Sequence, residues 1–439
     1  MSKTYQGILV AFVLSFAGYF LANIFFGEIH SRLIAVVVFL VTLWTNEALP
    51  LGVVSLLPII LFPSLEILTT SATTANYSKS IIFLFLGGFL LAIAVEKTGL
   101  HKVIANKLLN VFPKSSRGII FALAITSAFL SSLLSNTTTA LLLMPIALFL
   151  TDNKELKIRF VLAIAYGASI GGIVTPIGTP PNLILMGFLQ DNGLETITFI
   201  NWMIKMIPLA AIMLTIVPFV LSIGASQFKI ENEIESKMLS NEQKRLLKIL
   251  GLLVIVLLVN SYFKLSEAGI LLGFGLLMLV NTFGFLEWED TRKIPFEIIF
   301  LFGAGFSIAT AFGSTGLAES ISTLLLGLTE VNPIVLLLVV ATLVTFTTEV
   351  TSNTALISIA LPILYSLGMA SNIDTELILM VATICASYAF MLPIATPPNA
   401  IAMSSHVVSI KTMAMYGVLF NIFGILLTVL ISQIWWSLL

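Results

Sequence analysis

The chain has 439 residues, of which 58% are hydrophobic and 10% are charged, and its net charge is −1. An ordinary soluble domain carries about 25% charged residues, so the composition excludes that class and favours a membrane protein. Apolar runs of about 18 or more residues recur along the chain, which indicates membrane helices rather than the short alternating segments of a β-barrel. The charge balance gives no basic face for nucleic acid, and the single cysteine, Cys385, rules out an internal disulfide framework.

The first apolar run, about 7–27, is too long for the core of a signal peptide and shows no clear cleavage site, so we expect a retained first helix. From there, apolar segments predict eleven membrane crossings, of which the third is short and the fifth and tenth are long and interrupted. The predicted crossings are 7–27, 33–48, 50–63, 80–96, 160–190, 203–224, 246–262, 266–286, 297–312, 375–404 and 412–437.

Two further apolar segments, 119–150 and 333–368, each contain a Ser-Asn-Thr triplet near the middle. Each is long enough for two half-helices joined by a polar turn, which predicts two re-entrant hairpins. With the N-terminus in the cytoplasm, 17 of the 21 Lys and Arg residues fall on the cytoplasmic side, as the positive-inside rule requires. Counting either triplet segment as a full crossing spoils this separation. The first hairpin is therefore predicted to open from the cytoplasm and the second from outside, with the C-terminus outside.

The chain also contains an internal repeat, in which Ile81 corresponds to Ile298 and the register continues without a gap to residue 182. The stretch IIFLFLGGFLLAIAVEKTGL from Ile81 matches IIFLFGAGFSIATAFGSTGL from Ile298 at 12 of 20 positions, and PIGTPPN from Pro176 falls on PIATPPN from Pro393. Five predicted crossings separate equivalent points, and because five is odd the second unit should be inverted, as in many secondary transporters. The predicted organisation is an N-terminal helix at 1–32, a first repeat at 33–224, a cytoplasmic linker at 225–249 and a second repeat at 250–439.

The repeated polar motifs lie in segments that should be inside the bilayer. Paired prolines in each TPPN motif remove backbone donors, so the helices at 160–190 and 375–404 should be unwound near the middle of the membrane. A proline kink without a ligand is the alternative for a single motif, but two motifs in register, each with a triplet hairpin, favour a binding site. The start of a half-helix at each triplet suits a carboxylate, and the hydroxyl and amide oxygens suit a hard cation. Helix capping is a further role that does not exclude binding.

Charged side chains are almost missing from these motifs. Neither the triplets nor the TPPN motifs contain Lys or Arg, so positive charge for an anion must come from helix dipoles and bound cations. Glu349, three residues before Ser352, is either a functional carboxylate or a structural support for the hairpin arm. No HExxH, Walker A or GxSxG motif is present, so no enzyme activity or ATP-driven pump is predicted.

These residues resemble the divalent anion/sodium symporter family, the INDY-type di- and tricarboxylate transporters. The resemblance rests on both pairs of motifs, on TNEALPL, and on TTEVTSNTA from Thr347, and it covers nearly the whole chain. It implies a homodimeric elevator transporter in a bacterial inner or cell membrane, with eleven helices and two hairpins in each protomer. It also implies that the segments 98–111 and 315–329 are interfacial arm helices between a scaffold domain and the part that carries substrate.

The resemblance further implies two sodium sites and one dicarboxylate site. The first sodium site would use Ser131, Ser135, Asn136 and Gly178, and the second would use Thr348, Ser352, Asn353 and Ala395. The substrate would meet Ser135, Asn136, Thr137, Thr179, Ser352, Asn353, Thr354, Thr396 and Pro397. Ser132 stands where the second repeat has Glu349, so the two sodium sites should not be equivalent.

The predicted function is sodium-coupled transport of C4 dicarboxylates, the class of succinate, fumarate and malate. A sodium-independent dicarboxylate exchanger remains the main alternative, and Lys79 is then the first candidate to supply positive charge. A cation/proton antiporter of related fold should have acids in its broken helices, which both stretches lack. A channel would not need hairpins from two sides, and a receptor or scaffold leaves the duplicated motifs unexplained.

Overall fold

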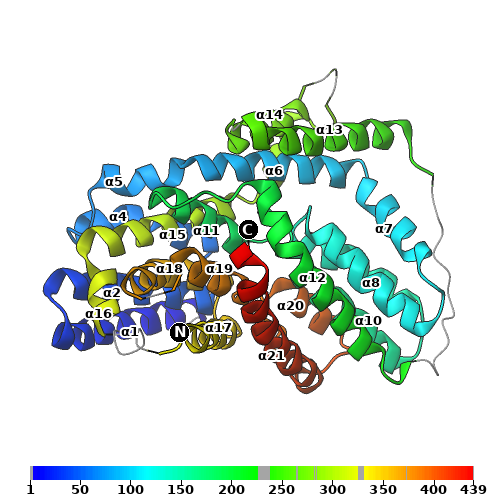
Figure 1. The fold of residues 1–439 in the computed structure, drawn as a ribbon. Coiled ribbons are helices and arrows are strands. Elements are labelled where there is room, and N and C mark those ends of the chain that lie inside the picture. The colour runs from blue at the N-terminus through cyan, green and yellow to red at the C-terminus, as the bar shows by residue number, and fades with distance from the viewer. Residues whose placement is uncertain are drawn as a thin grey trace. The chain divides into compact units, whose positions relative to one another are not determined.

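The computed structural model describes residues 3–225, 238–263, 265–280, 282, 284–324, 331–371 and 373–438, and every regular element within these ranges is helical (Figure 1). The α-helices are α1 Lys3–Phe25, α2 Glu28–Asn46, α3 Leu51–Leu56, α4 Pro58–Ser64, α5 Thr70–Ala75, α6 Ser80–Lys97, α7 Leu100–Val111, α8 Ser116–Ser131, α9 Asn136–Phe149, α10 Lys154–Gly172, α11 Pro180–Asp191, α12 Phe199–Ser222, α13 Asn241–Phe263, α14 Glu267–Leu277, α15 Phe296–Thr315, α16 Leu317–Leu324, α17 Pro333–Thr348, α18 Asn353–Ala370, α19 Thr375–Cys385, α20 Pro397–Ser404 and α21 Ile410–Ile434. Short 3-10 helices are η1 Asn76–Ser78, η3 Trp288–Lys293 and η5 Trp436–Leu438.

Seven helical stretches of the described chain are long and apolar enough to cross a membrane. They are Thr4–Phe25, Glu28–Asn46, Thr70–Lys97, Phe199–Ser222, Phe296–Thr315, Asn353–Ala370 and Ile410–Leu438. Shorter apolar helices are Leu51–Ser64, Ser116–Ser131, Asn136–Phe149, Glu267–Leu277, Pro333–Thr348 and Thr375–Cys385. The chain is therefore a multi-pass helical membrane protein, and the count of eleven crossings stays a prediction. Most of the predicted linker (226–237) and the end of the second arm segment (325–329) lie outside the described residues.

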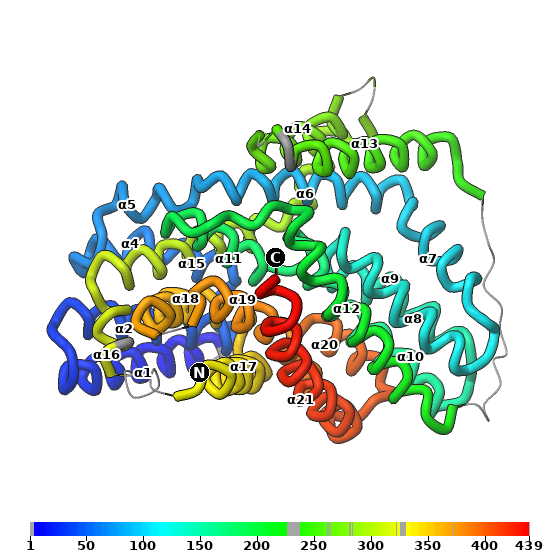
Figure 2. Tube along the Cα trace, viewed as in Figure 1, coloured from blue at the N-terminus to red at the C-terminus, as the bar shows by residue number. Residues whose placement is uncertain are grey.

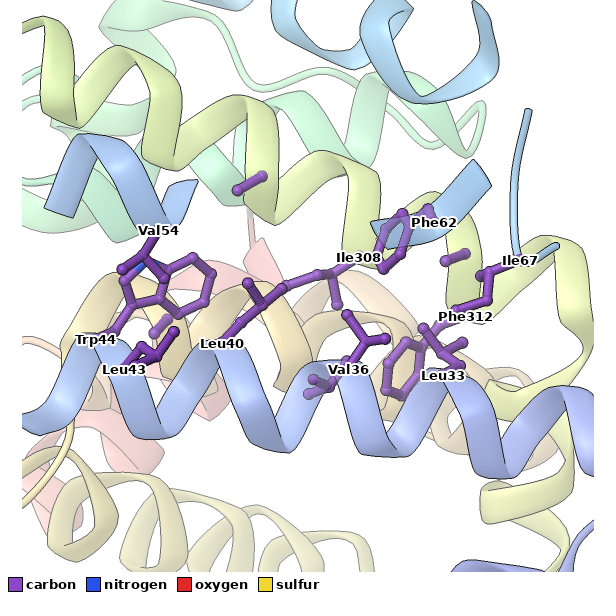
Figure 3. Close-up of a cluster of buried hydrophobic side chains, with 14 of the residues drawn as sticks. Leu33, Val36, Leu40, Leu43, Trp44, Val54, Phe62, Ile67, Ile308 and Phe312 are labelled. Atoms are coloured by element: carbon purple, nitrogen blue, oxygen red, sulfur yellow. The ribbon is translucent and has the colours of Figure 1, made fainter. Parts of the chain in front are cut away.

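The chain forms two compact units, each assembled from separate segments. The first unit contains 1–82, 183–196 and 295–386. Its core lies where α2 faces α3, α4 and α15, with Leu40, Trp44, Phe62 and Phe312 among its buried side chains (Figure 3). In the same unit α17 and α18 both pack against α19, so the second triplet segment is anchored to the first arm of the second broken helix.

The second unit contains 83–182, 197–294 and 387–439. Within it α8 and α9 both pack against α10, and these helices lie side by side in the chain trace (Figure 2). Gly167 and Gly171 of α10 face Ala124 and Ala128 of α8, and a Cβ on either glycine would lie 2.4 or 2.1 Å from the alanine carbonyl oxygen. Only glycine allows this approach, so the two backbones are locked together close to the first triplet.

Helix boundaries recur in the register of the sequence repeat. The helices α7, α8, α9 and α11 begin at the positions that correspond, in this register, to the first residues of α16, α17, α18 and α20, respectively. Both proline-containing helices are interrupted where the sequence predicted, because α11 and α20 each begin at the first proline of a TPPN motif. The non-helical segments differ in length, however, since 173–179 has seven residues and 386–396 has eleven.

Candidate functional site

Each triplet lies where the turn between two helices ends, and it starts the second of these helices. Ser135 is the N-cap of α9, and its Oγ accepts a hydrogen bond of 3.1 Å from the N–H of Thr138. Ser352 is the N-cap of α18, and its Oγ accepts a hydrogen bond of 3.5 Å from the N–H of Ala355. The capping role is thus confirmed at both triplets. It leaves other first-turn N–H groups and the positive end of the helix dipole directed at the turn.

The triplet asparagines accept hydrogen bonds from the preceding helices. In the second unit the Ser131 hydroxyl donates to Asn136 Oδ1 at 2.5 Å. In the first unit the Thr348 hydroxyl donates to Asn353 Oδ1 at 2.6 Å, and these two pairs are equivalent in the repeat register. The Thr348 hydroxyl also lies 2.9 Å from the carbonyl oxygen of Ala386, so one proton is shared between two acceptors. Clusters of neutral oxygens like these are the ligands that a hard cation prefers.

Three of the four residues predicted for the first cation site, Ser131, Asn136 and Gly178, lie close together within the second unit. A Cβ built on Gly172, the last residue of α10, would lie 3.0 Å from Asn136 Oδ1 and 3.3 Å from Thr179 Cβ. A Cβ on Gly178 would lie 2.5 Å from the carbonyl oxygen of Gly172. The end of α10, the unwound segment after it and the triplet asparagine are therefore in contact. The hydrogen bond from Ser131 to Asn136 adds the last residue of α8 to this group.

The remaining predicted residues divide between the units. Thr348, Ser352, Asn353 and Thr354 belong to the first unit, whereas Ala395, Thr396 and Pro397 belong to the second. The second sodium set is therefore not contained in one unit. The packing of α20 was not predicted from the sequence. This helix lies against α9 and α10, which brings the second TPPN motif to the segment that carries the first triplet. Ser135 is exposed and Thr137 half-buried at the same helix start.

Several side-chain atoms near the breaks are buried without a partner among the described residues. The Thr396 hydroxyl makes no hydrogen bond there although the residue is 5% exposed, and its N-cap position has no side-chain cap bond. Asn182 and Asn399, the last residues of the two TPPN motifs, each donate two hydrogen bonds from Nδ2 while Oδ1 has no partner in the described chain. An unpaired buried polar group costs about 1–3 kcal/mol, which identifies these atoms as candidates for contact with a ligand or for a structural task.

Lys79, Asp191 and Glu349 are charged residues of the first unit that lie outside the triplets and the TPPN motifs. Lys79 pairs with Asp191 in the first unit, and its ammonium lies 4.6 Å from the centre of the Phe306 ring. No local sequence pattern indicates this pair, because its members are separated by 112 positions along the chain. Glu349 is 3% exposed at the C-terminal cap of α17. In the part of the chain that the structure describes, no group of three His, Cys, Asp or Glu residues could hold a metal ion.

Residues 37–385 match the family described as citrate transporter. Two relatives named sodium-dependent dicarboxylate transporter SdcS, from Staphylococcus saprophyticus and Staphylococcus aureus strain USA300, are 33% and 32% identical to the chain. Each of these alignments covers 91% of this chain and 84% of the relative.

Solved structures of other transporters share the fold. MtrF of Neisseria gonorrhoeae, which represents a class of antimetabolite efflux pumps, covers 83% of this chain with a TM-score of 0.63 and 14% identity. The YdaH transporter of Alcanivorax borkumensis covers 84% of this chain with a TM-score of 0.61 and 15% identity. The similarity spans 83% and 87% of those two chains, respectively. At such identities the likeness concerns the fold alone, which is that of a helical membrane transporter.

Proposed function

Because the chain belongs to the citrate transporter family, among the divalent anion/sodium symporters, we propose that it carries C4 dicarboxylates across a bacterial cell membrane together with sodium ions. It is a multi-pass transporter and not an enzyme. The relatives named as sodium-dependent dicarboxylate transporters support the substrate class and the coupling ion. Succinate, fumarate and malate are the substrates that we expect.

The observation that carries this proposal is the repeat-related pair of hydroxyl–amide contacts, Ser131 with Asn136 and Thr348 with Asn353. Each contact places two side-chain oxygens at the start of a half-helix, where N–H groups can receive a carboxylate and the oxygens can receive a cation. Two such helix starts, one from each repeat, suit a short anion with a carboxylate at each end. We therefore assign one carboxylate of the substrate to Thr137 and its neighbours and the other to Thr354 and its neighbours.

Charge balance supports cation coupling. A dicarboxylate brings two negative charges, and burying an unpaired ion costs several kcal/mol even after relaxation. Each helix start contributes about half a positive charge, which offsets only part of this cost. Lys79, the side chain that would serve an exchanger, is already paired with Asp191. We propose that two sodium ions, bound as co-substrates at the two triplet turns, supply the remaining charge.

The ligands proposed for these ions are those that the family pattern indicates. The first ion would be held by Ser131, Ser135, Asn136 and Gly178, and the second by Thr348, Ser352, Asn353 and Ala395. Movement of the substrate is proposed to follow an elevator mechanism in a homodimer. The internal repeat, with the helix pairs α8–α9 and α17–α18 that carry the triplets, supports this mechanism, since inverted repeats are a recurrent basis for alternating access.

Uptake of radiolabelled succinate into proteoliposomes, with and without an inward sodium gradient, tests the proposal. We expect uptake to follow the sodium gradient and to be competed by fumarate and malate but not by monocarboxylates. Full-rate succinate counterflow in sodium-free choline buffer would reject symport and leave the exchanger. The exchanger would then need a positive side chain, and Lys79 would be the first to test although Asp191 pairs with it.

A further inference from the structure

The asparagines that end the two TPPN motifs make the same hydrogen bonds in both repeats. Asn182 Nδ2 donates to the carbonyl oxygens of Gly172 at 3.0 Å and Thr175 at 2.9 Å. Asn399 Nδ2 donates to the carbonyl oxygens of Ala389 at 2.8 Å and Leu392 at 3.1 Å. Acceptors and donors correspond in the repeat register at every position. Both asparagines are 0% exposed, and both lie in the second unit with their acceptors.

Asn182 joins the two halves of an interrupted helix, whereas Asn399 joins α20 to the unwound segment that precedes it. Asn182 belongs to the first turn of α11, and its acceptors are the last residue of α10 and a residue of the unwound segment. These carbonyl groups have lost the intrahelical donors that a continuous helix would provide. Asn182 supplies a donor to each of them and so links α10, the unwound segment and α11 through one side chain.

The carbonyl that each asparagine holds also fixes the residue proposed to bind the cation. The N–H of Gly178 donates to the carbonyl oxygen of Thr175 at 3.2 Å, and the N–H of Ala395 donates to that of Leu392 at 3.2 Å. Gly178 and Ala395 are the main-chain members of the two proposed sodium sites. The asparagine therefore acts on the cation ligand through one shared carbonyl group.

The bonds persist although the backbone around them differs. In the first repeat α10 continues to Gly172, whereas in the second α19 ends at Cys385, four residues before the equivalent Ala389. The equivalent carbonyl groups therefore accept the same hydrogen bonds whether or not they belong to a helix. Oδ1 of both asparagines is buried and has no partner among the described residues, so within these residues each amide acts through its two N–H donors and its acceptor is unsatisfied.

We propose that Asn182 and Asn399 are positioning residues that hold the unwound segments in the geometry required for sodium binding, Asn182 for the first site and Asn399 for the second. This inference rests on the proposed sodium coupling. It assigns to each asparagine an action on the cation rather than on the carboxylate, because the residues that it fixes are the cation ligands.

The substitutions Asn182→Asp and Asn399→Asp test this, since they keep the volume and remove the NH2 group. Asn260→Asp is the matched control, because Asn260 is also buried and donates through Nδ2 to a backbone carbonyl, that of Leu265 at 3.0 Å, outside the motifs. Each purified variant is titrated with sodium chloride against choline chloride, with thermal stability as the readout. Succinate uptake is measured at low and at saturating sodium.

We expect each motif variant to raise the sodium concentration at half-effect about tenfold or more, as the loss of an outer-shell partner does at metal sites. The KM for succinate at saturating sodium should change less than twofold, and Asn260→Asp should leave the sodium midpoint unchanged. If a motif variant does not fold, Asn182→Ser and Asn399→Ser keep one donor and should show a smaller rise.

Sodium midpoints equal to that of the wild type, with or without lower thermal stability, would overturn the positioning role and leave the asparagines as structural links. A wild-type protein without any response to sodium would instead overturn the proposed function, so the two failures are distinguishable. A rise in the succinate KM at saturating sodium that exceeds the rise in the sodium midpoint would also reject the assignment, because it would place the asparagines with the substrate.

Discussion

The buried hydroxyl of Thr396 gives a prediction in which stability and binding change in opposite directions. The substitution Thr396→Val keeps the shape of the side chain and removes a hydroxyl that has no hydrogen-bond partner in the part of the chain that the structure describes. Removing an unsatisfied buried polar group should raise the free energy of unfolding of the substrate-free protein by up to about 1–3 kcal/mol. If the hydroxyl donates to a substrate carboxylate, the same substitution should weaken binding by about 1.5–3 kcal/mol, or roughly ten- to a hundredfold.

Two measurements on one preparation separate these effects. Thermal unfolding in detergent without dicarboxylate reports the stability of the substrate-free protein. Succinate uptake at saturating sodium reports the KM. Thr126→Val is the matched control, because the Thr126 hydroxyl in α8 is also buried without a partner among the described residues but lies outside both motifs. The control should gain stability and keep the wild-type KM.

An unchanged KM for Thr396→Val would show that the hydroxyl does not face the substrate, and Thr396 would leave the proposed site. A lower melting temperature without substrate would contradict the structural observation itself, since it would mean that the hydroxyl has a partner. Only higher stability together with a higher KM agrees with the proposed role.

Other parts of the site give further predictions. Thr137→Ala and Thr354→Ala should each raise the succinate KM in uptake assays about tenfold or more, since a hydrogen bond to a charged group contributes about 1.5–3 kcal/mol; normal uptake in both would limit the triplets to capping. Ser131→Ala and Thr348→Val should raise the sodium concentration for half-maximal uptake more than the succinate KM, because each removes an oxygen that contacts a triplet asparagine. The double variant Lys79→Met, Asp191→Asn should retain sodium-dependent uptake; loss of uptake with normal folding would favour Lys79 as the counter-charge of an exchanger. The hydrogen bond from Lys97 lowers the pKa of Asp290 in the folded protein. The stabilisation from this ion pair is therefore complete above the unfolded pKa of about 3.9 and is lost as the pH falls from that value through the folded pKa. Asp290→Asn should flatten the acid-unfolding profile over this pH range.

The sequence predicted those features of the site that depend on local chemistry. The N-caps at Ser135 and Ser352 and the helix starts at Pro180 and Pro397 follow from preferences that act within one turn of helix.

Contacts between distant segments could not be predicted in this way. The packing of α20 against α9 and α10 depends on shapes that no local pattern records. The pair of Lys79 with Asp191 needs the fold to bring two ordinary surface-type residues together. The sequence shows that Asn182 and Asn399 end both TPPN motifs, but only the structure shows the backbone carbonyl groups to which they donate hydrogen bonds. The repeat was the one sequence signal that could have drawn attention to them.

Some interactions of the site occur in both repeats and others in only one. The hydrogen bonds of the triplet asparagines and of the TPPN asparagines occur in both repeats with the same partners by position. The ion pairs do not: Phe296 and Val408 stand where a second Lys79–Asp191 pair would be. A single ion pair that is still partly exposed, as Lys79–Asp191 is, contributes little, whereas a buried polar network must keep all its partners. The preserved bonds surround the unwound segments and triplet turns, which is the distribution expected if both copies still perform the same chemistry on an ion and a carboxylate. The two repeats nevertheless differ near the proposed sodium sites. Ser132 occupies the position that Glu349 has in the second repeat, and the non-helical segment after Cys385 is longer than the one after Gly172. We therefore expect the two sodium sites to differ in affinity.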